Sequence, residues 1–158
     1  MDKLWAPWRS KYIYLRKRVK CIFCGAKTEK NCLKRHIIER SKHSFAMLNL
    51  YPYNNGHVMV APYRHVKSLD LLSDVELLDL MKLLNRIKAR IDRKMKPRGY
   101  NIGVNIGRIA GAGFAGHVHI HIVPRWKGDT NFIPVVGDVK IVSESLDAVY
   151  QILKAAKC

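Results

Sequence analysis

The sequence predicts an α+β fold: a single domain over residues 1–158 with a mostly antiparallel sheet, one long helix and a C-terminal helix. Residues 44–63 contain no Asp, Glu, Lys or Arg, as expected for a buried pair of strands, whereas residues 73–95 have the apolar spacing of an amphipathic helix. Strand pairs that are adjacent in sequence, with one long helix between the pairs, favour an antiparallel meander over a doubly wound parallel sheet.

The first pair of strands is expected at residues 44–50 and 57–63. Pro52 and the tripeptide Asn-Asn-Gly that ends at Gly56 form a strong turn signal between them. The two strands are therefore predicted to form a hairpin. We expect residues 21–43, which precede it, to be irregular with a short strand or helix.

The long helix is expected to begin after Ser73 and to end before Pro97. Ser73 and Glu76 have the spacing of a capping box, in which each residue bonds to the backbone of the other. Apolar residues follow one side of this helix and basic residues the other. We interpret the basic side as a solvated surface.

The second pair of strands is expected at residues 100–107 and 117–124. A glycine-rich loop, residues 108–116, connects them. A final helix with an apolar side is expected to be capped by Ser143 and to run through Ala156.

The formal net charge of +17 indicates a surface that attracts polyanions such as nucleotides, nucleic acid or anionic membranes, although a solvated, lysine-rich surface explains it equally well. Residues 1–20 are a basic and aromatic extension that we expect to pack on the domain. The chain contains no apolar run of membrane-spanning length, and its N-terminus lacks the apolar segment of a signal peptide. We therefore expect a cytoplasmic protein with no membrane partner.

Three histidines alternate with apolar residues in the segment HVHIHIV, at His117, His119 and His121. On a strand they share one face at intervals of roughly 6–7 Å, and the apolar residues share the other. Such a row suits either half of a catalytic metal site or a nucleophile for phosphorus. The glycine-rich loop suits a phosphate, and no carboxylate lies between Asp92 and Asp129, which favours the nucleophile.

Cys21 and Cys24 have the C-x-x-C spacing of a metal site or a redox pair. For Cys32 and Cys158, which belong to no such motif, we expect ordinary thiols. A disulfide framework is not expected in a reducing compartment.

The chain resembles the histidine triad (HIT) superfamily, and within it the diadenosine tetraphosphate phosphorylase- and hydrolase-like branch. HVHIHIV matches the complete triad signature, in which histidine alternates with apolar residues. The resemblance covers nearly the whole chain and extends to the segments LWAPWRSKYI, CIFC, LNLYPYNNGHVMVAPYRHV, NIGVNIG, GAGFAGHVHIHIVPRW and GDTNFIPVVG.

The resemblance implies an α+β core, a homodimer and covalent chemistry. His119 would attack the α-phosphate of a nucleotide and form a nucleotidyl-imidazole intermediate, which a second acceptor removes. His121 would contact phosphate oxygens or the leaving group, and His57 would buttress the triad.

The resemblance also implies a set of substrate contacts. Asn49 would hold the ribose hydroxyls, and Asn105 would lie near the phosphates, where a role in a bulge or turn is the alternative. Backbone N–H groups of the loop would bind phosphate. Residues that could line the base pocket are Leu48, Leu50 and Met59, for which an ordinary core strand is an equal interpretation; the loop residues are Gly113, Phe114, Ala115 and Gly116.

Related HIT proteins with a C-x-x-C complete a zinc site with two histidines, which here are His65 and His117. A set of two cysteines and two histidines is a closed, structural site. His36 and His43 are alternative ligands that lie nearer in the sequence to Cys21 and Cys24, and an unmetallated dithiol is a further alternative. No organic cofactor is expected.

One departure concerns the loop before the triad, where nucleotide-hydrolysing branches carry Gln or Ser and this chain has Gly113 and Phe114. The departure favours the phosphorylase-like branch. The predicted function is cleavage of a dinucleoside polyphosphate or a nucleoside 5′-phosphoryl bond. The alternatives are a nucleic-acid-end deadenylase, which is not favoured because no separate DNA-binding motif is present, and a non-catalytic nucleotide-binding dimer.

Overall fold

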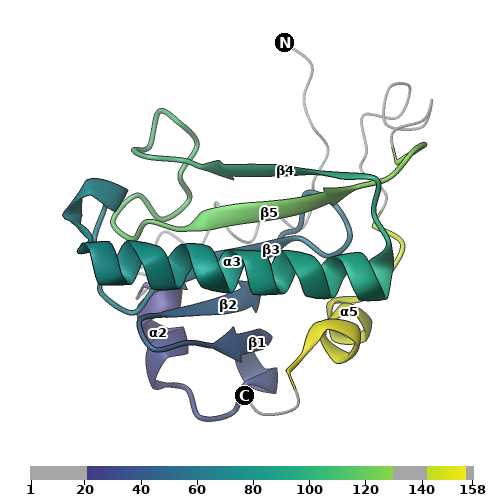
Figure 1. The fold of residues 1–158 in the computed structure, drawn as a ribbon, viewed down its shortest axis with the longest axis horizontal. Coiled ribbons are helices and arrows are strands. Elements are labelled where there is room, and N and C mark those ends of the chain that lie inside the picture. The colour runs from purple at the N-terminus through teal and green to yellow at the C-terminus, as the bar shows by residue number, and fades with distance from the viewer. Residues whose placement is uncertain (1–20, 130–141, 156–158) are drawn as a thin grey trace, which may run out of the picture.

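The computed structural model describes residues 21–129 and 142–155. The predicted roles of residues 1–20 and of most of the segment GDTNFIPVVG therefore lie outside the described residues. Five strands form one sheet in the order β1-β2-β3-β5-β4, and every neighbouring pair is antiparallel (Figure 1). The strands are β1 (Ile37–Arg40), β2 (Ser44–Leu48), β3 (Val58–Pro62), β4 (Gly99–Val104) and β5 (Ile120–Arg125).

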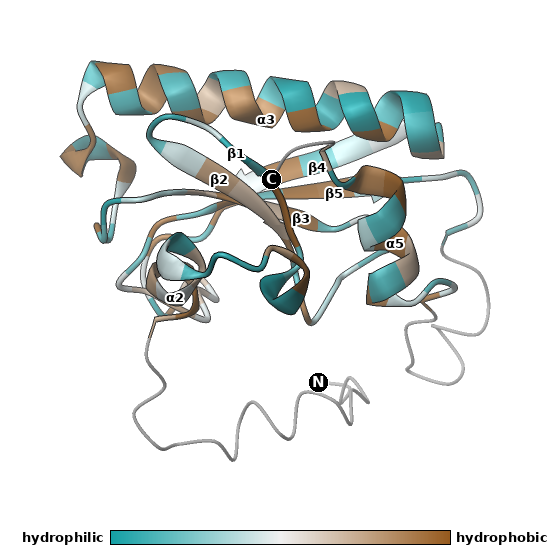
Figure 2. Cartoon of the chain, turned by 90° about the horizontal axis from the view of Figure 1, so that it is seen from below, coloured by the Kyte–Doolittle hydropathy of each residue, from teal (hydrophilic) through white to brown (hydrophobic). Residues whose placement is uncertain are grey.

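Helices cover both faces of this sheet (Figure 2). The α-helices are α2 (Ile22–Thr28), α3 (Asp74–Met95) and α5 (Leu146–Leu153), and two 3-10 helices are η1 (Leu33–Arg35) and η2 (Leu69–Leu71). α3 lies across one face, and α2 lies against the opposite face. The predicted α+β fold is confirmed.

Two apolar clusters lie on the two sides of the sheet. The main cluster joins the inner side of α3 to alternate residues of the central strands, including Leu83, Ile87 and Ile122. Burying each such side chain contributes about 1.5–3 kcal/mol. The smaller cluster, centred on Phe23 of α2 and Phe45 of β2, lies on the opposite face.

α3 begins where the sequence predicts. Ser73 is its N-cap, and the Ser73 backbone N–H donates to the Glu76 carboxylate at 2.9 Å, as the capping box requires. The helix ends at Met95, and Lys96 adopts a left-handed conformation with φ of 48°.

The predicted hairpin is confirmed as β2 paired with β3, but several boundaries are wrong. β5 begins at Ile120 rather than His117, because the preceding residues pair with the loop after β3: the Val118 N–H donates to the Val66 carbonyl at 2.7 Å. β4 ends at Val104, short of Gly107.

The ends of the chain's smaller elements also differ from prediction. Ser145, not Ser143, caps the final helix, since its side chain accepts the Ala148 N–H at 3.2 Å, and the helix ends at Leu153 rather than Ala156. The strand β1 was expected only as one of two options for the segment 21–43, which also forms α2 and η1.

Cys32 is disulfide-bonded and is not the ordinary thiol that we expected. Motif spacing does not reveal such a bond, because two cysteines pair wherever the fold brings their Cα atoms within about 7 Å. The thiol predicted at Cys158 lies outside the described residues. Within the described residues, no helix combines the length and the apolar character needed to cross a bilayer.

Candidate functional site

The three predicted histidines lie on the face of the sheet opposite α3. Val118, Ile120 and Ile122 point into the main cluster, so the alternating histidines point the other way. They are nevertheless buried, with exposed fractions of 1% for His117, 4% for His119 and 9% for His121. The alternation predicted from the sequence therefore holds, although only His121 lies within β5 itself.

A chain of hydrogen bonds determines which nitrogen of His121 carries the proton. The Tyr53 backbone N–H donates to His57 Nδ1 at 3.0 Å, so this nitrogen is an acceptor and His57 Nε2 carries the proton. His57 Nε2 lies 2.9 Å from His121 Nδ1 and donates to it. In neutral His121, therefore, Nδ1 accepts and Nε2 bears the hydrogen.

Both histidines of this pair are neutral at pH 7. Burial, followed by the proximity of His121 and His119, lowers the pKa of His57 to about 3. Burial, followed by the proximity of His119, lowers the pKa of His121 to about 4. His57 thus lies where a buttress of the triad was predicted.

His119 has the opposite tautomer. Its Nδ1 lies 2.9 Å from the backbone carbonyl of His117, which only accepts, so Nδ1 carries the proton and Nε2 has a lone pair. Burial lowers the pKa of His119, although the bond to the carbonyl acts in the other direction. The rings of His119 and His121 meet edge to face with centroids 4.8 Å apart. Two neutral imidazoles with opposite tautomers therefore lie side by side.

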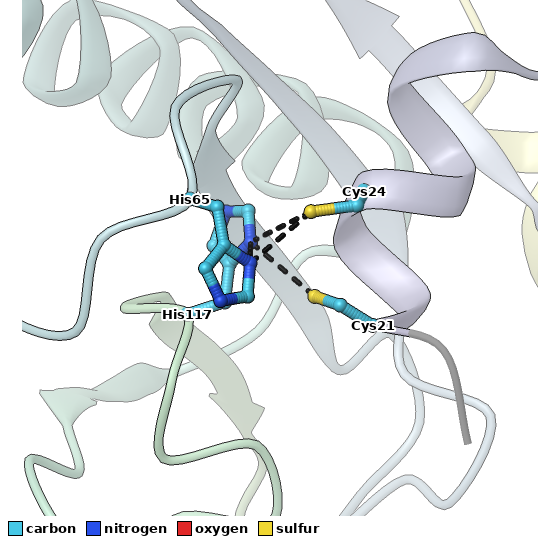
Figure 3. Close-up of side chains that lie close together, drawn as sticks. All are labelled: Cys21, Cys24, His65 and His117. Atoms are coloured by element: carbon cyan, nitrogen blue, oxygen red, sulfur yellow. Dashed lines mark hydrogen bonds between the residues drawn. The ribbon is translucent and has the colours of Figure 1, made fainter. Parts of the chain in front are cut away.

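Cys21, Cys24, His65 and His117 converge on one point, and their ligand atoms lie within 4.8 Å of one another (Figure 3). His117 Nε2 donates to the Pro62 carbonyl at 2.9 Å, so Nδ1 presents its lone pair to the thiols. These four residues are the predicted set. Among the described residues, no such group contains the alternatives His36 and His43, and His36 bonds instead to Asp147 at 2.9 Å.

Four of the six distances between these ligand atoms are close to those around a tetrahedral zinc ion, and the whole set lies within 4.8 Å. Zn–S bonds of about 2.3 Å and Zn–N bonds of about 2.0–2.1 Å give ligand-to-ligand distances of about 3.3–3.8 Å. Nδ1 of His117 lies 3.4 Å from Cys21 Sγ, 3.7 Å from Cys24 Sγ and 3.2 Å from His65 Nδ1, and His65 Nδ1 lies 3.1 Å from Cys24 Sγ. Four protein ligands leave no open position, so this set could hold a structural metal.

The glycine-rich loop lies directly before His117 and beside the four converging cysteines and histidines. A Cβ atom at Gly116 would come within 3.3 Å of His65 Nε2, so the loop approaches His65 closely. Within the described residues, the backbone N–H groups of Ala115 and Gly116 make no hydrogen bond and can bind an anion. Gly113 and Phe114 belong to the same loop, and Asn105 reaches it through Nδ2, 3.6 Å from where a Cβ of Gly111 would lie.

Only some of the residues predicted to contact the substrate lie close to the histidines. Met59 pairs with His121 across β3 and β5 and shares its face. Asn49 lies next to His57: its Nδ2 is 3.3 Å from His57 Nδ1, and its Oδ1 accepts the Tyr51 N–H at 2.9 Å. Leu50 is exposed in the following loop.

Leu48 is not brought to the histidines. It pairs with Val58 and lies in the main cluster under α3. Successive side chains of a strand point to opposite faces of the sheet, and Leu48 points away from the face that carries the triad histidines. The structure thus places Leu48 as the ordinary core residue that was the alternative interpretation.

Sequence reasoning missed Phe23, which packs on two histidines of the triad. Its ring centroid lies 5.0 Å from that of His117 and 4.6 Å from that of His119. The only signal was its position between the two cysteines of the C-x-x-C segment.

Known proteins share sequence similarity with this chain. The HIT domain profile matches residues 30–128. An AP-4-A phosphorylase of Mycobacterium tuberculosis is 44% identical over 110 residues, which cover 70% of this chain and 56% of that protein. The chain therefore aligns with little more than half the length of this curated relative.

Solved structures share the fold. A hypothetical histidine triad nucleotide-binding protein from Sulfolobus tokodaii superposes with a TM-score of 0.68 at 26% identity, covering 84% of this chain and 89% of that one. A zinc-bound histidine triad family protein from Mycobacterium smegmatis has a TM-score of 0.69 at 23% identity, with 87% and 92% covered. From the profile match, the sequence identity and the complete row of histidines, the chain belongs to the HIT family.

Proposed function

We propose that this protein is a nucleotide-processing enzyme that cleaves a dinucleoside polyphosphate, or a related nucleoside 5′-phosphoryl bond, through a nucleotidyl group on His119. The observation that carries the proposal is the pairing of opposite tautomers in two neighbouring rings: His119 has a lone pair on Nε2, and neutral His121 has its hydrogen on Nε2. One imidazole is ready to attack and its neighbour is ready to donate a proton.

In the first step, the lone pair of His119 Nε2 forms a bond to the α-phosphorus, and the bond from phosphorus to the leaving oxygen breaks. His121 Nε2–H donates its proton to that oxygen. The His119 ring becomes a phosphorylated imidazolium whose Nδ1–H remains bonded to the His117 carbonyl. The N–H groups of Ala115 and Gly116 would stabilise the negative charge on the phosphoryl oxygens.

In the second step, an acceptor oxygen attacks the same phosphorus and the P–N bond breaks. His121 Nε2, which now lacks its proton, accepts one from the attacking hydroxyl. Water as the acceptor gives hydrolysis, and inorganic phosphate gives phosphorolysis. The relative of Mycobacterium tuberculosis is named a phosphorylase, and the loop without Gln or Ser side chains favours that branch.

We propose zinc as the structural metal of Cys21, Cys24, His65 and His117. When bound, the ion supplies a cross-link between α2, the loop after β3 and the start of the triad segment. The proposal rests on the donor set of two thiols and two imidazoles and on the convergence of their ligand atoms within 4.8 Å. His117 thereby links the metal set to the nucleophile, since its carbonyl orients His119.

The function is tested by incubating the purified protein with diadenosine tetraphosphate, with and without inorganic phosphate. Release of ADP and ATP only when phosphate is present indicates phosphorolysis, and release of AMP without phosphate indicates hydrolysis. Absence of cleavage under both conditions, while an adenylated RNA or DNA end is processed, would replace the proposal by the deadenylase alternative.

We further propose that the protein is a homodimer that pairs through β4. Among the described residues β4 pairs only with β5, so it is an edge strand, and residues 100–107 carry no charge. Ile102 and Ile106 are exposed there. Met81 of α3 is exposed and lies two turns before Lys88, on the same side of the helix. Because the Lys88 ammonium lies over the Tyr100 ring of β4, this side of α3 faces β4, and Met81 extends the apolar surface there.

Ile102→Glu is expected to convert the dimer into a monomer, because a carboxylate at the centre of the paired edge would be buried without a partner. Light scattering after size exclusion measures the mass. Leu33→Glu is the matched control, since Leu33 is 46% exposed and Ile102 45%, and it lies next to β1 at the opposite edge of the sheet. A wild-type protein with the mass of a single chain would contradict the proposal.

A further inference from the structure

We propose that Phe23 is a positioning residue for His119, which holds the nucleophilic ring in place and stabilises the positive charge that develops on it. This inference rests on the proposed function of His119. It concerns a residue of the smaller apolar cluster, outside the triad and outside the metal ligands.

The contacts of Phe23 are specific to the reacting part of the site. Phe23 is fully buried in α2, with an exposed fraction of 0%. Its ring lies 4.6 Å from the ring of His119 at an interplanar angle of 33°, and 5.0 Å from the ring of His117 at 42°. It also meets Phe114 of the glycine-rich loop edge to face, at 6.2 Å. One side chain thus contacts the nucleophile, a metal ligand and the phosphate-binding loop.

The orientation of Phe23 leaves the attack open. An imidazole nitrogen attacks along its lone pair, which lies in the plane of the ring. Because Phe23 covers a face of His119 at a low angle, it leaves the in-plane direction of Nε2 uncovered. The His117 carbonyl holds Nδ1, and His121 meets the ring edge to face. Three contacts therefore fix the position and the plane of the nucleophile.

The same contact stabilises charge. Attack on phosphorus turns the neutral His119 ring into an imidazolium, since Nδ1 keeps its proton. The face of a benzene ring carries a negative quadrupole, which attracts a cation within about 6 Å and does so more strongly where water is excluded. Phe23 therefore interacts more favourably with the charged intermediate than with the resting imidazole, which is the condition for accelerating the chemical step.

The position of Phe23 in the sequence ties this contact to the metal set. Phe23 lies between Cys21 and Cys24, so a metal bound by these two thiols would fix the start of α2 and, with it, the aromatic ring. A shift of α2 moves the ring that covers the nucleophile. The C-x-x-C segment thus supplies two ligands of the proposed metal and also places a phenylalanine against the nucleophile.

The test replaces Phe23 by leucine and, in a parallel series, by phenylalanines with increasing fluorination, which keep the shape of the ring but weaken its quadrupole. We expect Phe23→Leu to lower kcat about 2- to 30-fold with KM little changed, and fluorination to lower it in graded steps. Phe45→Leu is the matched control, because Phe45 is equally buried in the same cluster but stacks on Tyr63 at 5.4 Å. Zinc content is measured for every variant and is expected to be unchanged.

A second readout separates this inference from the proposed function. In carbethoxylation, His119 Nε2 bonds to a carbonyl carbon of diethyl pyrocarbonate and ethyl carbonate leaves. This first step also places positive charge on the ring but does not depend on the natural substrate. Its rate is expected to fall with fluorination in the same order as kcat. A wild-type protein without nucleotide turnover would overturn the proposed function alone. A carbethoxylation rate that does not change with fluorination would overturn the role of Phe23. A Phe23→Leu variant with the same kcat as Phe45→Leu would also overturn it.

Discussion

Replacing His119 by asparagine is expected to lower nucleotide turnover about 10⁴-fold or more. The asparagine amide can take the place of Nδ1–H and donate to the His117 carbonyl, so the local hydrogen bond is kept. Only the lone pair of Nε2 is lost, and with it the covalent route. Product release is measured by chromatography, and the nucleotidyl protein is sought by mass spectrometry after rapid acid quench.

The control for this variant is His43→Asn, which changes a histidine that is absent from the triad and from the metal group. It is expected to keep wild-type turnover. His119→Asn is expected to keep the wild-type zinc content, because His119 is not among the four ligand residues. Turnover within tenfold of wild type in His119→Asn would show that the nucleophile has been assigned to the wrong residue.

Removal of the metal is expected to lower the melting temperature by about 8–16 °C. An ion present at 1,000 times its dissociation constant stabilises the folded state by about 4.1 kcal/mol, and each kcal/mol shifts the melting temperature of a domain of this size by about 2–4 °C. The effect is measured by scanning calorimetry before and after treatment with a chelator, and the stability is expected to return when zinc is added.

Cys21→Ser provides the matched comparison, since it removes one ligand atom with little change in volume. This variant is expected to have the low melting temperature already in the presence of zinc, and to respond little to the chelator. His36→Asn and His43→Asn should retain one zinc per chain. A native protein that contains no zinc, and whose melting temperature is the same with and without the chelator, would refute the metal site.

The architecture could be predicted where one local pattern decides the outcome. The capping box of Ser73 and Glu76 set the start of α3, and the uncharged segment around Gly56 gave the hairpin of β2 and β3. The strict alternation around His119 predicted the histidine face, because alternate residues of an extended chain point the same way.

The parts that could not be predicted depend on distant backbone groups. The proton on His121 is set by the Tyr53 N–H through His57, and the orientation of His117 depends on the Pro62 carbonyl. No spacing in the sequence encodes these contacts, which appear only when β3 and β5 pair in the observed register. Reading only the cysteines of the C-x-x-C segment likewise left Phe23 unnoticed.

Errors arose where a short element had competing signals. Ser143 and Ser145 are both suitable caps, and only the fold shows that Ser145 accepts the Ala148 N–H. For Leu48, a place in the base pocket and a place in the core were equal interpretations, and its side chain packs in the main cluster, on the other face of the sheet from the triad. A resemblance carried over position by position does not reveal such a change of face.

The hydrogen-bond chain from Tyr53 through His57 to His121 has a consequence for proton movement. A backbone amide does not give up its hydrogen at neutral pH, so the chain is blocked at Tyr53 and cannot relay protons between His121 and bulk water. Under the proposed reaction, the hydrogen that leaves with the first product must be replaced by one taken from the attacking acceptor. Each acceptor molecule that reacts therefore returns a proton to His121, and the reaction needs no proton channel through the domain.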